Sequence, residues 1–202
     1  MIRNIIFDMG NVLINYDPEH FIEREGVFGE DAALLMAAVF NAPEWPMMDA
    51  GALDEPDMEA AAFARLPERL HAVAHRLIYH WEEPSEPIPG MAALIRDIKA
   101  AGMGVYLLSN ASRRQYDYWP GIPGSECFDG RVVSAYERQV KPEPAIYRTL
   151  LTRYRLDPVQ CLFVDDLQKN VDGARAVGIP AVRFTGDVDA LRSAIFTEES
   201  DG

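Results

Sequence analysis

Short apolar runs that each end in a polar residue constrain the fold of this chain more than any other feature. Runs of this kind are typical of buried parallel strands. Open α/β sheets place their active sites at the carboxyl ends of such strands. The sequence therefore predicts a parallel sheet that gathers these polar groups at one edge. The residues that follow three of the runs are Asp8, Ser109 and the pair Asp165 and Asp166.

Strand-like and helix-like segments alternate through residues 89–202. Alternating β and α units predict the α/β class, with a Rossmann-like parallel sheet and helices on both of its faces. Gly102 and Gly178 follow two of the expected helices, at the position where a left-handed cap is favoured. We expect strands near residues 2–7, 104–109, 131–134, 160–164 and 180–184, and helices over 91–101, 145–154 and 170–177.

Residues 15–88 break this alternation and predict a small helical bundle inserted after the first strand. They are rich in Ala, Leu, Met and Glu. The exit, residues 82–90, is rich in proline and is typical of a hinge or linker. We therefore expect one domain built from residues 1–14 and 89–202, and a second built from residues 15–88. Helices of the insertion are expected over residues 31–40, 57–64 and 67–81.

Composition favours a soluble protein from a reducing compartment. Asp8 ends the first apolar run before it could form a signal peptide, and no stretch approaches the roughly 18 apolar residues of a spanning helix. Only Cys127 and Cys161 occur, so we expect no disulfide framework and a cytoplasmic location. The formal net charge of −13 argues against nucleic acid and anionic membranes as partners. Residues 197–202 are acidic and are expected to be frayed. The sequence leaves the oligomeric state open.

The chain resembles the haloacid dehalogenase-like hydrolase superfamily. Four motifs carry this resemblance, in the family's order and over nearly the full length: Asp8 with its glycine-bearing turn, Ser109 with Asn110, Lys141 before a proline, and Asp165 with Asp166. The resemblance implies a Rossmann-like core with an inserted helical cap that covers the active site and shapes substrate choice. The alternative interpretation of the insertion is a helical appendage with no part in catalysis.

The resemblance makes Asp8 the nucleophile of a phosphatase with a small phosphorylated metabolite as substrate. A carboxylate can attack phosphorus and form an aspartyl-phosphate, which divides one difficult step into two easier ones. Mg²⁺ would remove the repulsion between the two anions, because it binds carboxylate, carbonyl and phosphate oxygens together. The implied ligands are Asp8, the backbone carbonyl of Gly10, Asp166, and Asp165 either directly or through water. The alternative interpretation of Asp166 is that it only caps the helix that follows it.

The remaining motif residues are expected to bind the phosphoryl group. The hydroxyl of Ser109 and the backbone N–H of Asn110 can donate to its oxygens, where charge spreads in the transition state. The ammonium group of Lys141 supplies a positive charge and could also hold Asp8 and Asp165 in place. The alternatives are an ordinary turn serine and a solvated lysine, which is the commonest fate of that residue.

Further contacts are expected from residues close to these motifs. Arg113 follows Ser109 by four residues and is expected to reach phosphate or sugar oxygens. Asn170 follows Asp166 by four residues, one helical turn along, and is expected to brace the metal carboxylates. Other candidates for substrate contact, although such side chains more often lie in a core, are His20, Trp45, Met47, Met48, Trp81 and Trp119.

Gly10 departs from the pattern of most phosphatases in the superfamily, which read Asp-x-Asp and use the second Asp as general acid and base. A backbone carbonyl survives this change but a proton donor does not. General acid catalysis contributes about 10²–10⁴-fold, so its loss should matter least for acidic leaving groups such as the anomeric hydroxyl of a sugar 1-phosphate. Residues 8–12 also resemble a subgroup that includes an α-D-glucose-1-phosphate phosphatase, with weaker likeness at residues 108–113 and 118–120.

Two alternative functions stay open beside the phosphatase. The first is a catalytically weak relative that binds a ligand or a partner through its cap, and Gly10 motivates it. The second is another enzyme of the superfamily, such as a dehalogenase, a phosphonate hydrolase or a phosphomutase. A mutase is disfavoured because it needs the missing proton donor. A dehalogenase is disfavoured because its chemistry does not require the metal site that Asp165 and Asp166 would build.

Overall fold

A single sheet of five parallel strands forms the centre of the protein, as the computed structural model shows for residues 1–196. The strand order is β3-β2-β1-β4-β5, which places β1 in the middle. The predicted α/β class and parallel sheet are confirmed. The predicted frayed tail, residues 197–202, lies outside the described residues. The strands are β1 (Asn4–Phe7), β2 (Gly104–Ser109), β3 (Gly130–Val133), β4 (Cys161–Asp165) and β5 (Ala181–Arg183).

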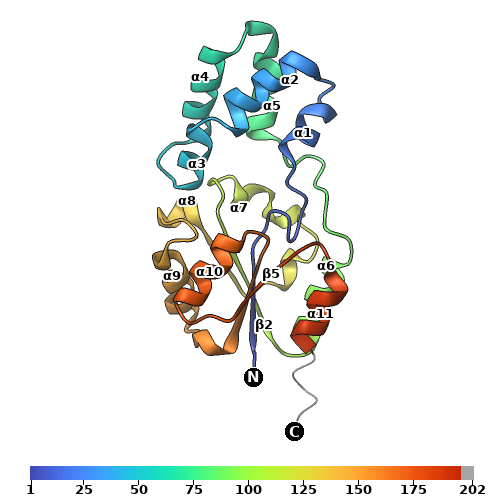
Figure 1. Cartoon of the computed structure of the whole chain (residues 1–202), viewed down its shortest axis with the longest axis vertical. Helices are drawn as coiled ribbons and strands as arrows, with labels where there is room; N and C mark the ends of the chain where they lie inside the picture. Colours follow the sequence, from blue (N-terminus) through green and yellow to red (C-terminus); the bar gives the residue numbers. More distant parts are fainter. Residues whose placement is uncertain (197–202) are drawn as a thin grey trace.

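Helices cover both faces of this sheet (Figure 1). The helices α9 (Pro144–Tyr154) and α10 (Gln168–Ala176) lie on one face, and α6 (Met91–Ala100) and α11 (Val188–Phe196) lie on the other. Alternate residues of each strand point to opposite faces, so β1 contributes to two separate apolar clusters. Short turns of helix complete this part of the chain: α7 (Gln115–Tyr118), η3 (Trp119–Gly121), η4 (Ser125–Cys127), α8 (Ser134–Glu137) and η5 (Pro158–Gln160).

The predicted left-handed caps are present. Gly102 follows α6 with φ 79°, and Gly178 follows α10 with φ 87°. Glycine adopts this backbone conformation without the steric penalty that a side chain would bring. Both cysteines, Cys127 and Cys161, are free. Among residues 1–196 the structure contains no helix with both the length and the apolar character needed to cross a membrane.

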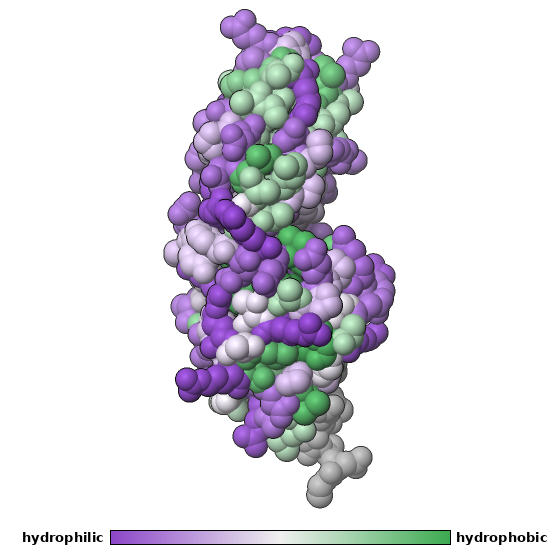
Figure 2. Space-filling view, turned by 90° about the vertical axis from the view of Figure 1, so that its left-hand side faces the viewer, coloured by the Kyte–Doolittle hydropathy of each residue, from purple (hydrophilic) through white to green (hydrophobic). Residues whose placement is uncertain are grey.

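Residues 15–88, the helical insertion, form a separate group of helices beyond the carboxyl ends of the strands (Figure 1). The molecule narrows where this group meets the rest of the protein (Figure 2). The chain enters and leaves side by side, because the N–H of Asn15 donates to the carbonyl of Glu86 at 2.8 Å. The elements are α1 (Pro18–Arg24), α2 (Gly29–Leu35), the π-helix η1 (Met36–Phe40), α3 (Glu44–Asp49), α4 (Glu55–Arg65), η2 (Glu68–Leu70) and α5 (His71–Tyr79).

The helices of the insertion differ in detail from the prediction. The expected helix over 31–40 is α2 followed by a π-helical turn, and the one over 67–81 is divided into η2 and α5. The helices α1 and α3 were not predicted. The start of α1 does carry a sequence signal, because Asp17 caps the N–H groups of Glu19 and His20, and Pro18 occupies the first turn. Short helices of this kind depend on packing more than on propensity.

Candidate active site

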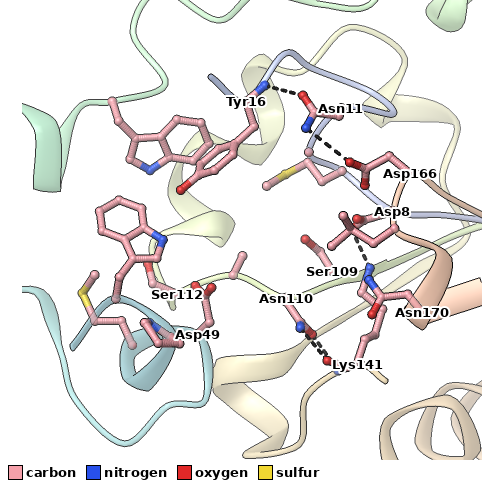
Figure 3. Close-up of a pocket in the computed structure, with 18 of the residues that line it drawn as sticks. Asp8, Asn11, Tyr16, Asp49, Ser109, Asn110, Ser112, Lys141, Asp166 and Asn170 are labelled. Atoms are coloured by element: carbon pink, nitrogen blue, oxygen red, sulfur yellow. Dashed lines mark hydrogen bonds and ion pairs between the residues drawn. The ribbon is translucent and has the colours of Figure 1, made fainter. Parts of the chain in front are cut away.

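The polar residues at the strand ends meet, as predicted, at the edge of the sheet that faces the insertion. Asp8 follows the central strand β1, whose last residue is paired with Val164 of β4 and Leu107 of β2. This register places Asp8 beside the ends of both neighbours. There Asp8 and Ser109 line a cavity of about 470 Å³ (Figure 3).

Lys141 lies at the centre of the charged groups and is almost fully buried. Its Nζ atom is 2.7 Å from Oδ1 of Asp8 and 2.7 Å from Oδ2 of Asp165. Burial lowers the pKa of Lys141, but the two carboxylates outweigh this effect and raise it above its ordinary value. Lys141 is therefore a permanent cation that holds both carboxylates, as predicted, and it is not a solvated surface lysine.

Asp165 is completely buried, and both of its oxygens accept hydrogen bonds. Oδ1 accepts from the backbone N–H of Leu167 at 2.9 Å and from the amide of Asn170 at 3.0 Å. Oδ2 accepts from Lys141 at 2.7 Å and from Asn170 at 3.1 Å. The predicted contact of Asn170 with a site carboxylate is present. Asp165 thus orients its neighbours and has little capacity left for a further ligand.

Negative charge exceeds positive charge at this edge of the sheet. Oxygen atoms of Asp8, Asp165 and Asp166 all lie within 4.8 Å of one another. Burial raises the pKa of Asp8 to about 7, although Lys141 opposes this rise. Burial also raises the pKa of Asp166, against a hydrogen bond from Asn11. Three closely spaced carboxylate groups with a single buried lysine between them carry excess negative charge, and such a set of oxygens fits a hard divalent ion such as Mg²⁺.

Two asparagines have roles that the sequence interpretation missed. The side chain of Asn110 clamps the main chain of Lys141, accepting from its N–H at 2.8 Å and donating to its carbonyl at 3.0 Å. Asn11 has φ 54°, donates to Oδ2 of Asp166 at 3.3 Å and accepts from the N–H of Tyr16 at 2.9 Å. Asparagine tolerates the left-handed region better than other side chains, so the Gly10-Asn11 turn was a usable signal.

The structure does not bring Arg113 to the cavity, which corrects the expectation that it reaches phosphate or sugar oxygens. Its guanidinium group forms an ion pair with Asp54 and donates to the carbonyl of Gly51 at 3.2 Å. Residues 110–114 do not form a helix, so a spacing of four from Ser109 does not return to the same side. Arg113 joins the insertion to the rest of the protein instead.

The insertion provides one wall of the cavity, which combines the aromatic rings of Tyr16, Trp45 and Trp81 with other apolar side chains. Tyr16 and Trp81 pack edge to face with their ring centres 5.2 Å apart, and Trp81 packs in the same manner against Tyr118 at 5.8 Å. Burial raises the pKa of Tyr16 and of Tyr118 well above the ordinary value, so both phenols keep their protons. Of the other predicted contact candidates, Trp45, Met48 and Trp81 line the cavity, and His20, Met47 and Trp119 do not.

One carboxylate, Asp49, belongs to this aromatic wall and was missed by the sequence interpretation. It ends α3 and lines the cavity (Figure 3). Burial raises the pKa of Asp49 to about 7, and the neighbouring Glu55 adds to the rise. No sequence motif marks this residue, because its position depends on how α3 packs against the rest of the protein.

Comparison with known proteins supports the same family as the motifs. Residues 2–178 match the family model of the haloacid dehalogenase-like hydrolases. The chain is 26% identical over 193 residues to a fructose-1-phosphate phosphatase of Escherichia coli, covering 88% of this chain and 94% of that protein. It is 25% identical over 190 residues to a sesquiterpene phosphatase of Aspergillus oryzae, covering 89% and 88%.

A solved structure shares the fold over nearly the whole chain. It is a haloacid dehalogenase family enzyme of Bacteroides thetaiotaomicron, an aspartate-to-alanine variant in complex with magnesium and inorganic phosphate. The TM-score is 0.72 at 19% identity, covering 95% of this chain and 99% of that one. Because residues 2–178 match the family model and carry its four motifs at one edge of the sheet, the chain belongs to the haloacid dehalogenase-like hydrolases.

Proposed function

We propose that this protein is a Mg²⁺-dependent phosphatase that hydrolyses a small phosphorylated metabolite, such as a sugar phosphate, through an aspartyl-phosphate on Asp8. The observation that carries the proposal is the Asp8 carboxylate, which lines the cavity and is held at 2.7 Å by the buried ammonium group of Lys141. The similarity to two phosphatases and to an enzyme crystallised with magnesium and phosphate supports it.

The groups around Asp8 have separate tasks in this proposal. The backbone N–H of Asp8 donates to the carbonyl of Val164 at 2.9 Å, which fixes its main chain at the end of β1. Lys141 holds Oδ1, which leaves the other oxygen to attack phosphorus. The hydroxyl of Ser109 and the N–H of Asn110 donate to the phosphoryl oxygens, and such donors are worth several kcal/mol in the transition state.

Asp8, the carbonyl of Gly10 and Asp166 would hold the Mg²⁺ ion. Asp165 would act through water, because both of its oxygens already accept hydrogen bonds from Lys141, Asn170 and the main chain. When bound, Mg²⁺ would offset the repulsion between the attacking carboxylate and the phosphate. Asn11 would keep Asp166 turned toward the ion through the hydrogen bond between them.

The helical insertion, residues 15–88, serves as a cap in this proposal, and residues 1–14 and 89–202 form the core domain. The cap closes the cavity opposite Asp8 and would determine which organic group fits. Its aromatic wall suits the apolar face of a sugar or a similar carbon skeleton. Arg113 acts as a link between core and cap through Asp54 and takes no part in binding phosphate.

A binding protein with little catalytic activity is the second candidate, and Gly10 is the observation that favours it. The two functions are separated by measuring hydrolysis of sugar 1-phosphates, sugar 6-phosphates and an activated aryl phosphate, each with Mg²⁺ and with a chelator. We expect turnover that depends on the metal. If folded protein with Mg²⁺ hydrolyses none of these esters, including the aryl ester, the phosphatase proposal is wrong and the binding function takes its place.

A further inference from the structure

The core side of the cavity has no carboxyl group free to donate a proton to a leaving alcohol, since Asp166 is a proposed metal ligand and Asp165 already accepts hydrogen bonds at both oxygens. Gly10 carries no side chain, Asp8 is the nucleophile, and Lys141 is shared between two carboxylates. The fold does not impose the glycine, because its φ is not in the left-handed region and an added Cβ would lie 3.5 Å from Cβ of Tyr16, an ordinary contact. A proton donor must therefore come from another part of the cavity.

The direction of the reaction indicates which wall should supply it. In phosphoryl transfer the attacking and the leaving oxygens lie roughly in line on opposite sides of phosphorus. The leaving oxygen therefore points away from Asp8, toward the wall that the cap provides. Asp49 lies on that wall, across the open centre of the cavity from Asp8 (Figure 3).

Asp49 is the one carboxylate among the cap residues that line the cavity in the described part of the chain. No hydrogen bond or ion pair joins its carboxyl group to any other residue of 1–196, so the group is available to a ligand. Burial raises its pKa to about 7, with a further contribution from Glu55. A carboxyl group with a pKa near the working pH is suited to both giving and taking a proton.

Contacts with the core hold Asp49 at the cavity. The hydroxyl of Ser134 donates to the backbone carbonyl of Asp49 at 2.5 Å. Two residues further on, Gly51 has φ 68°, and an added Cβ there would meet the carbonyl oxygen of Ala135 at 2.1 Å. The main chain of the cap at Gly51 therefore lies so close to the main chain of the core at Ala135 that no side chain fits between them.

A second pair of contacts fixes the other end of the same loop. The hydroxyl of Ser112 donates to the carboxylate of Glu55 at 2.6 Å, and Arg113 pairs with Asp54. The loop that joins α3 to α4 is thus tied to the core on both sides. Asp49 is positioned with the rigidity that a proton donor requires, although it belongs to the cap.

We propose that Asp49 is the general acid and base of the reaction, and this inference rests on the proposed phosphatase function. In the first step Asp8 forms a bond to phosphorus, the bond to the leaving oxygen breaks, and the carboxyl proton of Asp49 passes to that oxygen to give the alcohol. In the second step the Asp49 carboxylate takes a proton from the water that attacks phosphorus. The bond from Asp8 to phosphorus then breaks, and inorganic phosphate leaves.

The test compares wild type with Asp49→Asn on a series of phosphate monoesters, from activated aryl esters to alkyl esters, with Mg²⁺ present. The value of kcat/KM reports the first step, in which the leaving group departs. We expect Asp49→Asn to lower kcat/KM by about 10²-fold or more for alkyl esters, and by less than about threefold for the most acidic aryl ester. The matched control is Asp31→Asn, which alters a cap carboxylate on an exposed ion pair with Arg69 and should change neither value.

Each outcome decides between two roles for Asp49. A loss of kcat/KM that grows as the leaving group becomes less acidic supports the role of proton donor. A residue that only positions the substrate would lower kcat/KM for all esters by the same factor. An equal loss across the series, or no loss from a variant with wild-type thermal unfolding, overturns the inference and leaves the phosphatase function intact. If wild type itself hydrolyses no ester of the series, the phosphatase function fails and this inference fails with it.

Discussion

The two walls of the cavity are built on different principles. On the core wall the principal charged groups are tied to each other, with Lys141 between Asp8 and Asp165 at 2.7 Å from each. The cap wall combines the rings of Tyr16 and Trp81 with a carboxylate, Asp49, whose side chain has no hydrogen-bond or ion-pair partner among residues 1–196. The comparison indicates that the core wall is built to hold a phosphate and a metal ion in fixed positions. The cap wall leaves one polar group for the substrate.

The largest effect should come from removing the nucleophile of the core wall. Asp8→Asn keeps the size of the side chain but cannot attack phosphorus, so we expect turnover to fall by at least about 10⁴-fold. The fold should survive, because the amide replaces a carboxyl group whose pKa burial already raises to about 7. Hydrolysis of an aryl phosphate and far-UV circular dichroism measure the two properties. Near-normal turnover would show that Asp8 is not the nucleophile.

The stability of the protein should depend on Lys141, because this lysine pairs with both buried carboxylates of the core wall. Lys141→Met leaves two buried carboxylates without their cation, which should cost about 3–5 kcal/mol of unfolding free energy. Urea denaturation in the presence of a chelator measures the change without help from a metal ion. The control is Lys169→Met, an exposed lysine that lines the same cavity, with an expected change within about 0.5 kcal/mol. Equal costs at the two positions would contradict the role given to Lys141.

The close approach of cap and core at Gly51 should matter for activity as well as stability. Gly51→Ala would place Cβ 2.1 Å from the carbonyl oxygen of Ala135, so the loop after Asp49 must move away from the core. For alkyl esters, which depend on the proton from Asp49, we expect steady-state kcat/KM to fall by about tenfold or more, because a small misplacement of a catalytic group is costly. Gly26→Ala is the matched control, since Gly26 has φ 75° but nothing within 4 Å of an added Cβ. It should lose stability through backbone strain, about 1 kcal/mol, and keep its activity.

The unpartnered carboxylate of the cap wall should reduce stability at high pH. The pKa of Asp49 is about 7 in the folded protein, against 3.8 as its ordinary value. Between these values the folded protein holds a proton that the unfolded chain has released, so the free energy of unfolding falls as pH rises through this window. Asp49→Asn should therefore be roughly 1 kcal/mol more stable than wild type at pH 8, after allowance for screening by water in the cavity, and equal to it at pH 4.

Chemical denaturation of both proteins at pH 4, 6 and 8 measures this difference. A variant less stable than wild type at pH 8 would show that the Asp49 carboxylate has a stabilising partner. It would then resemble the groups of the core wall, and the contrast between the two walls would be lost.

The smallest effect is expected at the position where the family usually has its acid. Gly10→Ala adds only a Cβ at 3.5 Å from Tyr16, and the backbone carbonyl proposed as a metal ligand is unchanged. We expect kcat/KM within about threefold of wild type, which is less than 1 kcal/mol in barrier height. Steady-state kinetics with an aryl phosphate test this. A loss of 10²-fold would mean that the bare glycine is itself required on the core wall.

The core wall could be predicted from the sequence because its geometry follows from regular structure. Parallel strands in register bring their ends together, so an apolar run followed by Asp8 and another followed by Asp165 are sufficient to place both carboxylates. These placements needed only local periodicity and the rule that parallel strands share a direction. Asn170 also contacts a site carboxylate, but helical spacing does not explain this contact, because its partner Asp165 lies five residues earlier, at the end of β4.

The cap wall could not be predicted because its residues meet through packing between irregular segments. Asp49 reaches the cavity only because the loop after α3 is tied to Ser134 and passes closely over Ala135, neither of which has a local signature. Arg113 was placed wrongly because helical spacing was applied to a segment that is not a helix. Side chains on turns and loops need the tertiary structure to fix their direction.

The chemistry assigned to Asp8 can be tested by trapping the intermediate. Wild type is mixed with an activated aryl phosphate and Mg²⁺, quenched with acid during turnover, and digested. The mass of the peptide that contains Asp8 is then measured, with Asp8→Asn treated identically as the control. We expect a phosphoryl group on the wild-type peptide, at Asp8, and none on the variant. Steady turnover with no phosphoryl group on that peptide, or with the group on another residue, would contradict the proposed function.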